Sequence, residues 1–435
     1  MISFIVQLAM LPLLVVYFHR VSLPAILLNI WVGIFITIES FAAVLGAATT
    51  NLSRLAGTGF FTVAEVANWL MLALPRLFSN GDLASIRLPH YSGAGRVVYV
   101  VYAIVIIFAA YAANRWRPFE LGKQPFVTSR AALIAATFAA MVLAGIIILH
   151  PLSAPRPDGR LRFDFLDVGQ GDATLVTFPN GATMLVDGGG RLNYRETDDA
   201  GEAFVRDEQG VGETVVSAFL WHQGYAELDY IVATHADTDH IQGLSDVVRN
   251  FDVDEAIVGR VALDDPELTT FMEAASRIGT PVTRILRGDR IEIAGVTVEV
   301  LSPPDADVAT GARTANNDSV VLRFVRGTRS FLLAGDIERE GELDLLKYAG
   351  SIAADVIKVP HHGSRTSSTS AFVAATRTTL AIIPVGRSSR YGHPHDEVVD
   401  RWQGAGAVVI TTGQNGTTTV STDGTDLRID SFARK

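Results

Sequence analysis

The sequence predicts a layered α/β domain that follows an α-helical transmembrane region. Three observations support this fold class. The chain has 435 residues, of which 49% are hydrophobic, and this fraction points to a membrane portion. Apolar runs of helix length are concentrated in the first 150 residues. After residue 160, short strand patterns alternate with helical patterns, as in layered α/β folds.

The N-terminal region contains four apolar stretches, at 2–18, 22–48, 97–113 and 131–149. A helix needs about 20 apolar residues to cross a bilayer, so the second and fourth stretches are the clearest spans. The first stretch lacks a basic start and another apolar run follows it directly, which favours a helix over a signal peptide. Residues 62–79 form an amphipathic pattern that lies in the interface or completes a further span. A buried soluble bundle is the less favoured alternative.

Charge divides the chain at the same boundary. Residues 1–150 hold 9 of the 36 Lys and Arg residues and 4 of the 46 Asp and Glu residues. The acidic remainder argues against a protein that coats nucleic acid generally, although a local anion site stays possible in principle. The basic loop 114–130 is expected in the cytoplasm. We therefore expect a multi-pass protein of the inner or plasma membrane, with its soluble domain on the extracytoplasmic side.

A linker at 151–160 separates the membrane region, 1–150, from the soluble domain, 161–435. It contains three prolines and should be irregular. The Asn180-Gly181 turn predicts a hairpin between the second and third strands. The expected strands are 161–168, 173–178, 183–186, 228–233, 291–301, 319–325, 329–334, 354–359, 379–384 and 407–411. The expected helices are 212–224, 264–278, 339–349, 369–376 and 396–404.

The strongest chemical signal follows the apolar strand 228–233. His235, Asp237, Asp239 and His240 supply four possible metal ligands within six residues. The carboxyl end of a strand is where binding loops gather in α/β proteins. Cysteine is absent from the chain, so any metal must be held by His, Asp or Glu. A polar loop that merely contains two histidines is the alternative interpretation.

Further candidate ligands follow other predicted strands. Asp336 ends Leu-Leu-Ala-Gly-Asp, and His361 and His362 follow Val-Ile-Lys-Val-Pro. His393 and His395 come after the strand at 379–384. Each pattern alone also fits a turn, a helix cap or a structural histidine pair. Together they supply enough ligands for two metal ions.

These motifs resemble a known family. His-Ala-Asp-Thr-Asp-His, at 235–240, is similar to the His-x-His-x-Asp-His signature of metallo-β-lactamase-fold enzymes, with Asp237 in place of the second histidine. The motifs at 165–173, 185–189, 316–322, 333–337 and 358–364 resemble the soluble domain of ComEC-type competence proteins, and the match covers most of 161–425. Residues 18–22 also resemble the end of that family's channel domain. The resemblance implies a metallo-β-lactamase αββα sandwich, and a chain that is a C-terminal fragment or a reduced relative.

The resemblance also implies a role for each ligand. His235 and Asp237 would hold one metal, and Asp239 and His240 the other, together with His361 or His362. Asp336 would bridge both ions, and Asp187 would orient the ligand loop from behind. The family fold's usual histidine between the second and last ligand segments is missing here, because no histidine lies between His240 and His361. Asn316, Asn317 or water is expected to take that place.

The expected cofactor is a pair of divalent ions, Zn²⁺ or Mn²⁺, since oxygen-rich ligation also suits the harder ion. Such a pair activates a hydroxide for hydrolysis. Asp239 and His393 are the expected catalytic residues, with His393 as proton donor or phosphate contact. Candidate substrate contacts are Lys358, Ser364, Arg365 and Arg387, because cationic and hydroxyl groups suit phosphate.

The predicted function is hydrolysis of a phosphodiester, foremost single-stranded DNA during DNA uptake. Hydrolysis of another phosphoester and a non-catalytic, DNA-binding channel subunit are the alternatives. Expected partners are the DNA or another phosphodiester, membrane lipid and other competence-channel subunits.

Overall fold

The computed structural model describes residues 2–22, 24–79, 85–115, 130–151, 153–191, 210–260, 265–305, 316–348 and 350–432. The chain divides into two compact units. One consists of residues 1–154 with 221–224, and the other of residues 155–220 with 225–435.

The first unit is helical. Its helices are α1 (Ile2–Phe18), α2 (Ala25–Thr50), α3 (Arg54–Ser79), α4 (Val97–Arg115) and α5 (Arg130–Leu149). The strands β1 (Arg20–Val21) and β2 (Ile86–Arg87) pair antiparallel. The indole nitrogen of Trp31 on α2 donates to the carbonyl of Leu70 on α3 at 2.9 Å and joins the two helices. Tyr102 of α4 donates to the carbonyl of Leu8 on α1 at 2.8 Å.

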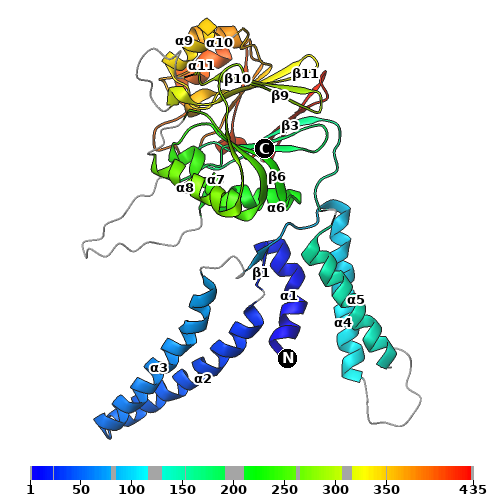
Figure 1. The fold of residues 1–435 in the computed structure, drawn as a ribbon, viewed down its shortest axis with the longest axis vertical. Helices are drawn as coiled ribbons and strands as arrows, with labels where there is room; N and C mark the ends of the chain where they lie inside the picture. Colours follow the sequence, from blue (N-terminus) through cyan, green and yellow to red (C-terminus); the bar gives the residue numbers. More distant parts are fainter. Residues whose placement is uncertain are drawn as a thin grey trace. The chain divides into compact units, whose positions relative to one another are not determined.

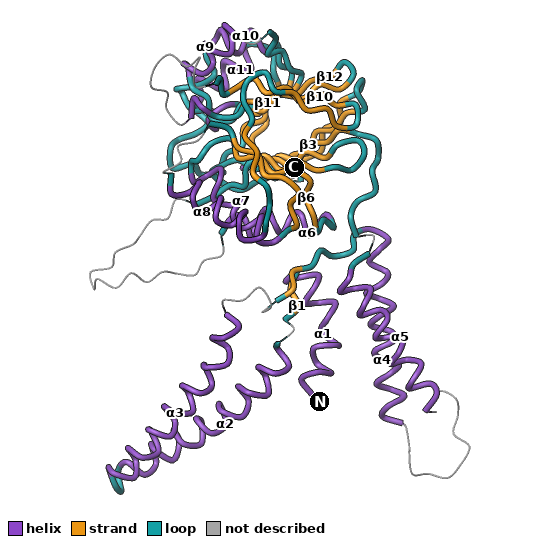
Figure 2. The backbone as a smooth tube through the Cα atoms, viewed as in Figure 1, coloured by secondary structure: helices purple, strands orange, loops and turns teal. Residues whose placement is uncertain are grey.

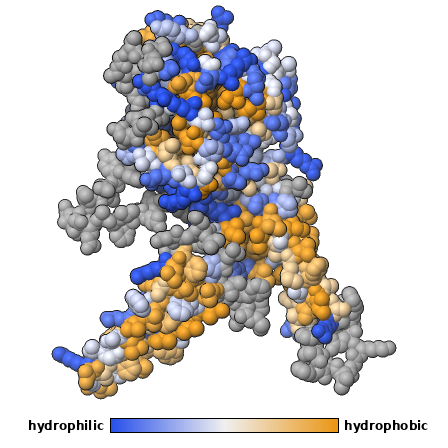
Figure 3. Space-filling view, viewed as in Figure 1, coloured by the Kyte–Doolittle hydropathy of each residue, from blue (hydrophilic) through white to orange (hydrophobic). Residues whose placement is uncertain are grey.

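Four helices of this unit are long and apolar enough to cross a membrane, within the part of the chain that the structure describes. They cover Leu27–Thr50, Arg54–Phe78, Gly93–Arg115 and Arg130–Leu149. Apolar side chains cover the exposed surfaces of these helices, drawn in orange in Figure 3. The amphipathic segment predicted at 62–79 is the second half of α3, a helix long enough to span. The basic loop at 114–130 lies mostly outside the described residues.

The second unit contains two mixed sheets (Figures 1 and 2). The eight-stranded sheet has the order β17-β16-β3-β4-β5-β6-β7-β8 and the seven-stranded sheet β15-β14-β13-β12-β11-β10-β9. The strands of the first are β3 (Leu161–Phe165), β4 (Thr174–Thr177), β5 (Thr183–Val186), β6 (Glu227–Ala233), β7 (Asp252–Val258), β8 (Val282–Arg284), β16 (Thr418–Thr422) and β17 (Leu427–Ser431). Those of the second are β9 (Arg290–Ile293), β10 (Val296–Ser302), β11 (Val321–Arg326), β12 (Arg329–Leu333), β13 (Val356–Lys358), β14 (Leu380–Ile383) and β15 (Val408–Thr411).

Strand periodicity builds two cores on opposite faces of the seven-stranded sheet. In β14, Leu380 and Ile382 belong to the core between the sheets, where Phe163 stacks on Phe331 at 4.2 Å between ring centroids. The alternate residues of β14 belong to a second core with the buried Trp402. In that core, side chains of α9 (Arg339–Tyr348), α10 (Ser370–Thr376) and α11 (Asp396–Gly404) pack against the outer face of the seven-stranded sheet. Successive side chains of a strand point to opposite faces of the sheet, so a fully apolar strand contributes side chains to both cores.

Helices also cover the eight-stranded sheet. They are η3 (Gly212–Ser217), α7 (Thr238–Asn250) and α8 (Pro266–Ile278), and α7 contacts β6 and β7; α6 (Ala218–Gln223) follows η3 in the chain. Both sheets thus lie between two helical layers (Figure 1), which is the αββα sandwich that the family resemblance implied.

Several elements differ from the prediction. The strand expected at 291–301 is the hairpin of β9 and β10, which turns at Ala294 and Gly295 with φ of 50° and 76°. The segment after His235 is mostly the helix α7 rather than a loop. β7, β8, β16 and β17 were not predicted. β8 and β16 contain one apolar residue each and β17 alternates over only five positions, and such patterns are weak in a single sequence.

Candidate metal centre

The site begins where β6 ends and α7 begins. Asp237 is the N-cap residue of α7, and Asp239 lies in its first turn. A carboxylate at this position interacts favourably with the helix dipole. His235 and His240 are buried, with 2% and 0% of their surfaces exposed. The start of α7 therefore turns two imidazoles inward and leaves the two carboxylates partly open to solvent.

Two loops pack closely against this helix start. Gly171 has φ of 125°, and a Cβ there would lie 2.3 Å from the carbonyl oxygen of Asp239. A Cβ on Gly190 would lie 1.9 Å from the carbonyl oxygen of Thr238. Only glycine allows such approach of two backbones. The Gly-Gln-Gly-Asp and Asp-Gly-Gly-Gly segments thus hold the ligand-bearing turn in place.

The histidine pair lies in a turn with left-handed backbone. His361 and His362, in η6 (Pro360–Gly363), have φ of 51° and 52°. This conformation is costly for residues other than glycine and is found most often at functional sites. It separates the two side chains: His362 is buried, whereas the side chain of His361 is 22% exposed and its Nδ1 lies 3.5 Å from Glu338. The structure thus directs His362 toward the other ligands.

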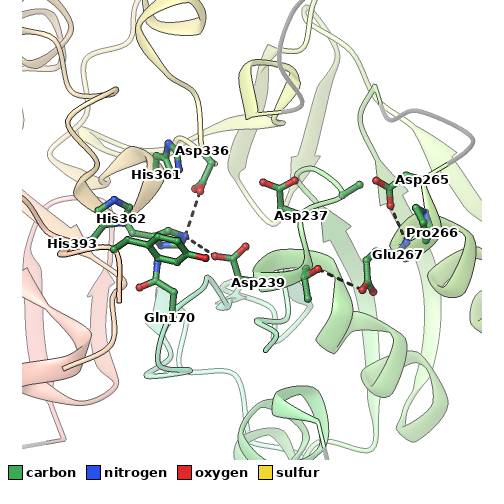
Figure 4. A pocket seen from close by; sticks show the side chains of 13 residues that line it. Gln170, Asp237, Asp239, Asp265, Pro266, Glu267, Asp336, His361, His362 and His393 are labelled. Carbon is green, nitrogen blue, oxygen red and sulfur yellow. Dashed lines mark hydrogen bonds and ion pairs between the residues drawn. The ribbon is translucent and has the colours of Figure 1, made fainter. Parts of the chain in front are cut away.

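Asp336, in the loop after β12, lies at the centre of the cluster. Its Oδ2 is 3.2 Å from Nε2 of His240 and 3.4 Å from Nε2 of His362. Nε2 of His362 is also 3.4 Å from Oδ2 of Asp239, and Figure 4 marks the contacts of His362 with both carboxylates. Within the described residues, four groups of mutually close ligand atoms result: Asp239, His240 and His362; His235, His240 and Asp336; Asp172, Asp336 and His362; and Asp172, Asp187 and His240. Asp237 adds a carboxylate oxygen 3.6 Å from Nε2 of His235.

The hydrogen bonds behind these histidines fix their tautomers. Nδ1 of His240 donates to Oδ2 of Asp187 at 2.9 Å, and that carboxylate also accepts the hydroxyl proton of Thr234. Because the Thr234 hydroxyl donates its proton to Asp187, its oxygen accepts a hydrogen bond from Nδ1 of His235 at 3.0 Å. Nδ1 of His362 donates to the carbonyl of Pro384 at 2.9 Å. All three histidines therefore hold a proton on Nδ1, which leaves Nε2 as the nitrogen that would bind a metal ion.

The residues fit a divalent metal ion. Nε2 of His235, His240 and His362 are buried and lack a hydrogen-bond partner within the described residues. A buried polar atom without a partner is costly unless a ligand satisfies it. Three imidazole nitrogens and two carboxylates are a donor set for Zn²⁺ or Mn²⁺. Asp187, predicted to support the ligand loop from behind, accepts hydrogen bonds from Thr234 and from Nδ1 of His240.

Two buried charged residues complete the cluster. Oδ1 of Asp172 lies 3.3 Å from Nδ1 of His362, and the other oxygen of Asp172 contacts the ammonium group of Lys358. The prediction that Lys358 contacts substrate is wrong, because its side chain is only 3% exposed and its charge faces Asp172 and Asp336. Asp172 was not predicted as a site residue. Its position in the Gly-Gln-Gly-Asp motif was the available signal.

The carboxylates shift the pKa values of the basic groups upward. Burial alone would lower the pKa of His362, but Asp336 and Asp172 outweigh it and raise the pKa to about 10. The pKa of His240 is likewise raised against its burial, by Asp336, Asp187 and Asp172. Burial would raise the pKa of Asp336, yet His240, His362 and Lys358 lower it well below its usual range. Without metal, protons on the imidazoles thus balance the acidic cluster.

A cavity of about 580 Å³ opens beside the cluster. The metal-ligand candidates Asp237, Asp239, Asp336, His361 and His362 line it, together with Gln170, Ala236, Thr238, Asp265, Pro266, Glu267, Tyr391 and His393 (Figure 4). Burial and the neighbouring imidazoles lower the pKa of His393 to about 4, so its ring is neutral at pH 7. Gln170, Asp265, Glu267 and Tyr391 were not predicted, because they come from loops far apart in the chain.

The remaining predicted substrate contacts do not line this cavity. Ser364 is buried and its hydroxyl lies 3.0 Å from that of Thr366. Arg365 points to Glu397 at 3.8 Å, and Nε of Arg387 donates to the carbonyl of Gly413 at 3.1 Å. Their expected place beside the substrate is therefore not supported by the geometry.

Asn317 also has a role other than the expected one. Its side-chain oxygen accepts the backbone N–H groups of Glu338 and Gly341, each at 2.9 Å. The residue is buried and fixes the loop that follows Asp336. It does not replace the missing histidine as a ligand, since its oxygen is already engaged by two donors.

Two protein-family models match parts of the chain. Residues 166–387 match the metallo-β-lactamase superfamily, and residues 1–116 match the competence protein family. Among solved structures, the metallo-β-lactamase fold protein YhfI from Bacillus subtilis is similar over 57% of this chain and 95% of its own, with a TM-score of 0.36 and 10% identity. A diphosphatase from the PhnP family covers 57% of this chain and 94% of its own, with a TM-score of 0.33 and 13% identity.

The curated relatives include competence proteins. ComE operon protein 3 of Bacillus subtilis (strain 168) is 30% identical over 422 residues, covering 96% of this chain and 50% of its own. Competence protein ComA of Neisseria gonorrhoeae is 28% identical over 280 residues, covering 64% of this chain and 34% of its own. The chain thus spans at most about half the length of these relatives. It belongs to the metallo-β-lactamase superfamily, carries a competence-protein region in its N-terminal part, and combines a fold that binds divalent metal with membrane helices.

Proposed function

We propose that this chain is a membrane-anchored, metal-dependent phosphodiesterase that cleaves single-stranded DNA during DNA uptake. The observation that supports hydrolysis most strongly is that the buried Nε2 atoms of three histidines, which make no hydrogen bond within the described residues, lie beside the carboxylates of Asp237, Asp239 and Asp336. The likeness to competence proteins supports DNA as the substrate.

In this proposal, each residue of the site has a defined task. Asp239, His240, Asp336 and His362 would hold one divalent ion, and His235 and Asp237 would hold a second, with Asp336 within reach of both. A bound ion pair supplies an activated hydroxide and offsets the charge that develops on phosphate oxygens. His393, neutral at pH 7, donates a hydrogen bond to a phosphate oxygen rather than a proton. Asp187 and Thr234 keep the imidazoles in the ligating tautomer.

Hydrolysis of a single-stranded oligonucleotide in Mn²⁺ or Zn²⁺ tests the proposal. The full chain in detergent is expected to cleave it, and Asp336→Asn or Asp239→Asn to abolish cleavage. Asp355→Asn is the matched control, because Asp355 pairs with Arg329 away from the cavity. Cleavage that survives Asp336→Asn would exclude this site. DNA binding without turnover in any divalent metal would instead favour a non-catalytic channel subunit.

One observation favours a smaller phosphoester as a second candidate substrate. The described residues that line the cavity include five carboxylates and no Lys or Arg. Such a wall attracts cations but repels a long polyanion. A panel of nucleotides and simple phosphodiesters, assayed beside the oligonucleotide, separates the two: a higher kcat/KM for the small esters would identify them as the preferred class.

A further inference from the structure

Lys358 is a buried cation that joins ligand-side carboxylates from both sheets. It is the last residue of β13, and Asp336 follows the neighbouring parallel strand β12. Asp172 precedes β4 of the other sheet. The ammonium group contacts the carboxylate of Asp172, lies 3.0 Å from Oδ1 of Asp336 and donates to the carbonyl of Gly335 at 2.7 Å. All of its donors are therefore directed at the ligand cluster.

These contacts divide the two oxygens of Asp336 between different partners. Lys358 engages Oδ1, whereas Oδ2 faces Nε2 of His240 and of His362. A carboxylate whose second oxygen is held by an ammonium group offers a metal a single oxygen. Removing that contact would free Oδ1 as an additional ligand.

The positive charge of Lys358 also balances part of the negative charge of the cluster's carboxylates. Five carboxylates, those of Asp172, Asp187, Asp237, Asp239 and Asp336, surround the three imidazoles. A pair of divalent ions offsets four of these charges, and the ammonium of Lys358 offsets the fifth. A buried charge is tolerated only when it is paired in this way.

We propose that Lys358 is a positioning residue that restricts Asp336 to one ligand oxygen and thereby sets the preference of the centre for Zn²⁺ over Mn²⁺. Zn²⁺ favours four ligands, whereas Mn²⁺ accepts more oxygen ligands. The inference rests on the metal centre of the proposed function and not on its DNA substrate.

The test compares Zn²⁺ and Mn²⁺ affinities and the visible spectrum of the Co²⁺-loaded full chain in detergent. In Lys358→Met, Zn²⁺ affinity is expected to fall by roughly 10- to 100-fold, the usual effect of losing a group that orients a ligand. Mn²⁺ affinity should change less, and the Co²⁺ absorption should weaken as the coordination number rises. Arg323→Met is the control, since it removes a cation that pairs with Glu299 at 2.8 Å away from the centre.

A second variant keeps the test decisive if the single change prevents folding. Lys358→Met/Asp172→Asn removes both partners of the buried pair, which is tolerated better than removing one. It also frees Oδ1 of Asp336, so the same change of spectrum and of the Zn²⁺-to-Mn²⁺ ratio is expected. An unchanged spectrum, or equal loss of both affinities, would overturn the inference. Wild-type protein that binds metal but cleaves no DNA refutes only the nuclease proposal.

Discussion

At the scale of the residue, the turn at 360–363 decides which histidine can bind metal. The left-handed backbone buries the imidazole of His362 beside Asp239 and Asp336, and leaves His361 at the cavity wall near Glu338. The sequence could not separate the two, because both follow the same strand and neither spacing nor residue type distinguishes them.

Substitution of the two histidines should therefore have unequal effects. Loss of a residue that only orients a metal ligand lowers metal affinity by up to roughly 100-fold. His362→Ala is expected to lower it by more than that, because it removes a direct ligand. His361→Ala should leave the metal content unchanged. Elemental analysis of the two purified variants checks this, and equal metal loss in both would show that the pair acts as a unit.

Protons on the imidazoles predict how pH affects the centre. The pKa of His362 is raised to about 10 and that of His240 is also raised, both above the ordinary 6.5. In the metal-free protein their charge therefore adds stability that is complete below pH 6.5 and is lost as the pH rises toward 10. A metal ion must displace these protons, so metal affinity should increase with pH over the same range.

Calorimetry in buffers of different ionisation enthalpy measures this displacement. At pH 7.5, metal binding should release about two protons, one from each imidazole. Asp187→Asn, which removes a negative charge that raises the pKa of His240, should reduce the number released. No dependence of the heat on the buffer would contradict the protonated state of the metal-free cluster.

At the scale of the element, ligands converge because loops leave the ends of neighbouring strands. β12, β13 and β14 are parallel neighbours, and the segments that follow them carry Asp336, His362 and His393. This convergence could be predicted from sequence, since each motif follows an apolar strand. The roles of Asp172, Lys358 and Asn317 could not, because burial and pairing across the two sheets are not encoded in local patterns.

The side-chain amide of Asn317 stabilises the loop after Asp336, because its oxygen accepts two backbone N–H groups there. Asn317→Ala is expected to lower the free energy of unfolding by about 1–3 kcal/mol for each of the two backbone N–H groups that lose their acceptor. Asn317→Asp, which keeps an acceptor oxygen, should lose less. Urea unfolding of the metal-free protein checks both variants. A change in metal stoichiometry without loss of stability would instead make Asn317 a ligand.

At the scale of the whole molecule, the chain joins a helical unit with apolar surfaces to a unit with its own two-sheet core. The division was visible in the sequence through hydropathy and charge. The helix α3 was less clear, because Pro75, Arg76 and polar residues interrupt its apolar pattern.

The two units predict different behaviour on fractionation. The full chain should remain in the membrane pellet after an alkaline carbonate wash, because four helices are long enough to span. A shortened chain of residues 155–435 should stay in the supernatant and bind the same metal. Release of the full chain by carbonate would show that its helices do not cross the bilayer.

The central claim is that Asp239, His240, Asp336 and His362 hold a divalent ion together. Anomalous diffraction at the Zn²⁺ or Mn²⁺ edge, from crystals grown with that metal, tests it most directly. The expected result is a peak about 2.0–2.2 Å from Nε2 of His240 and His362 and from Oδ2 of Asp336. Absence of a peak at this cluster, or a peak at other residues only, would show that these four side chains do not hold the metal.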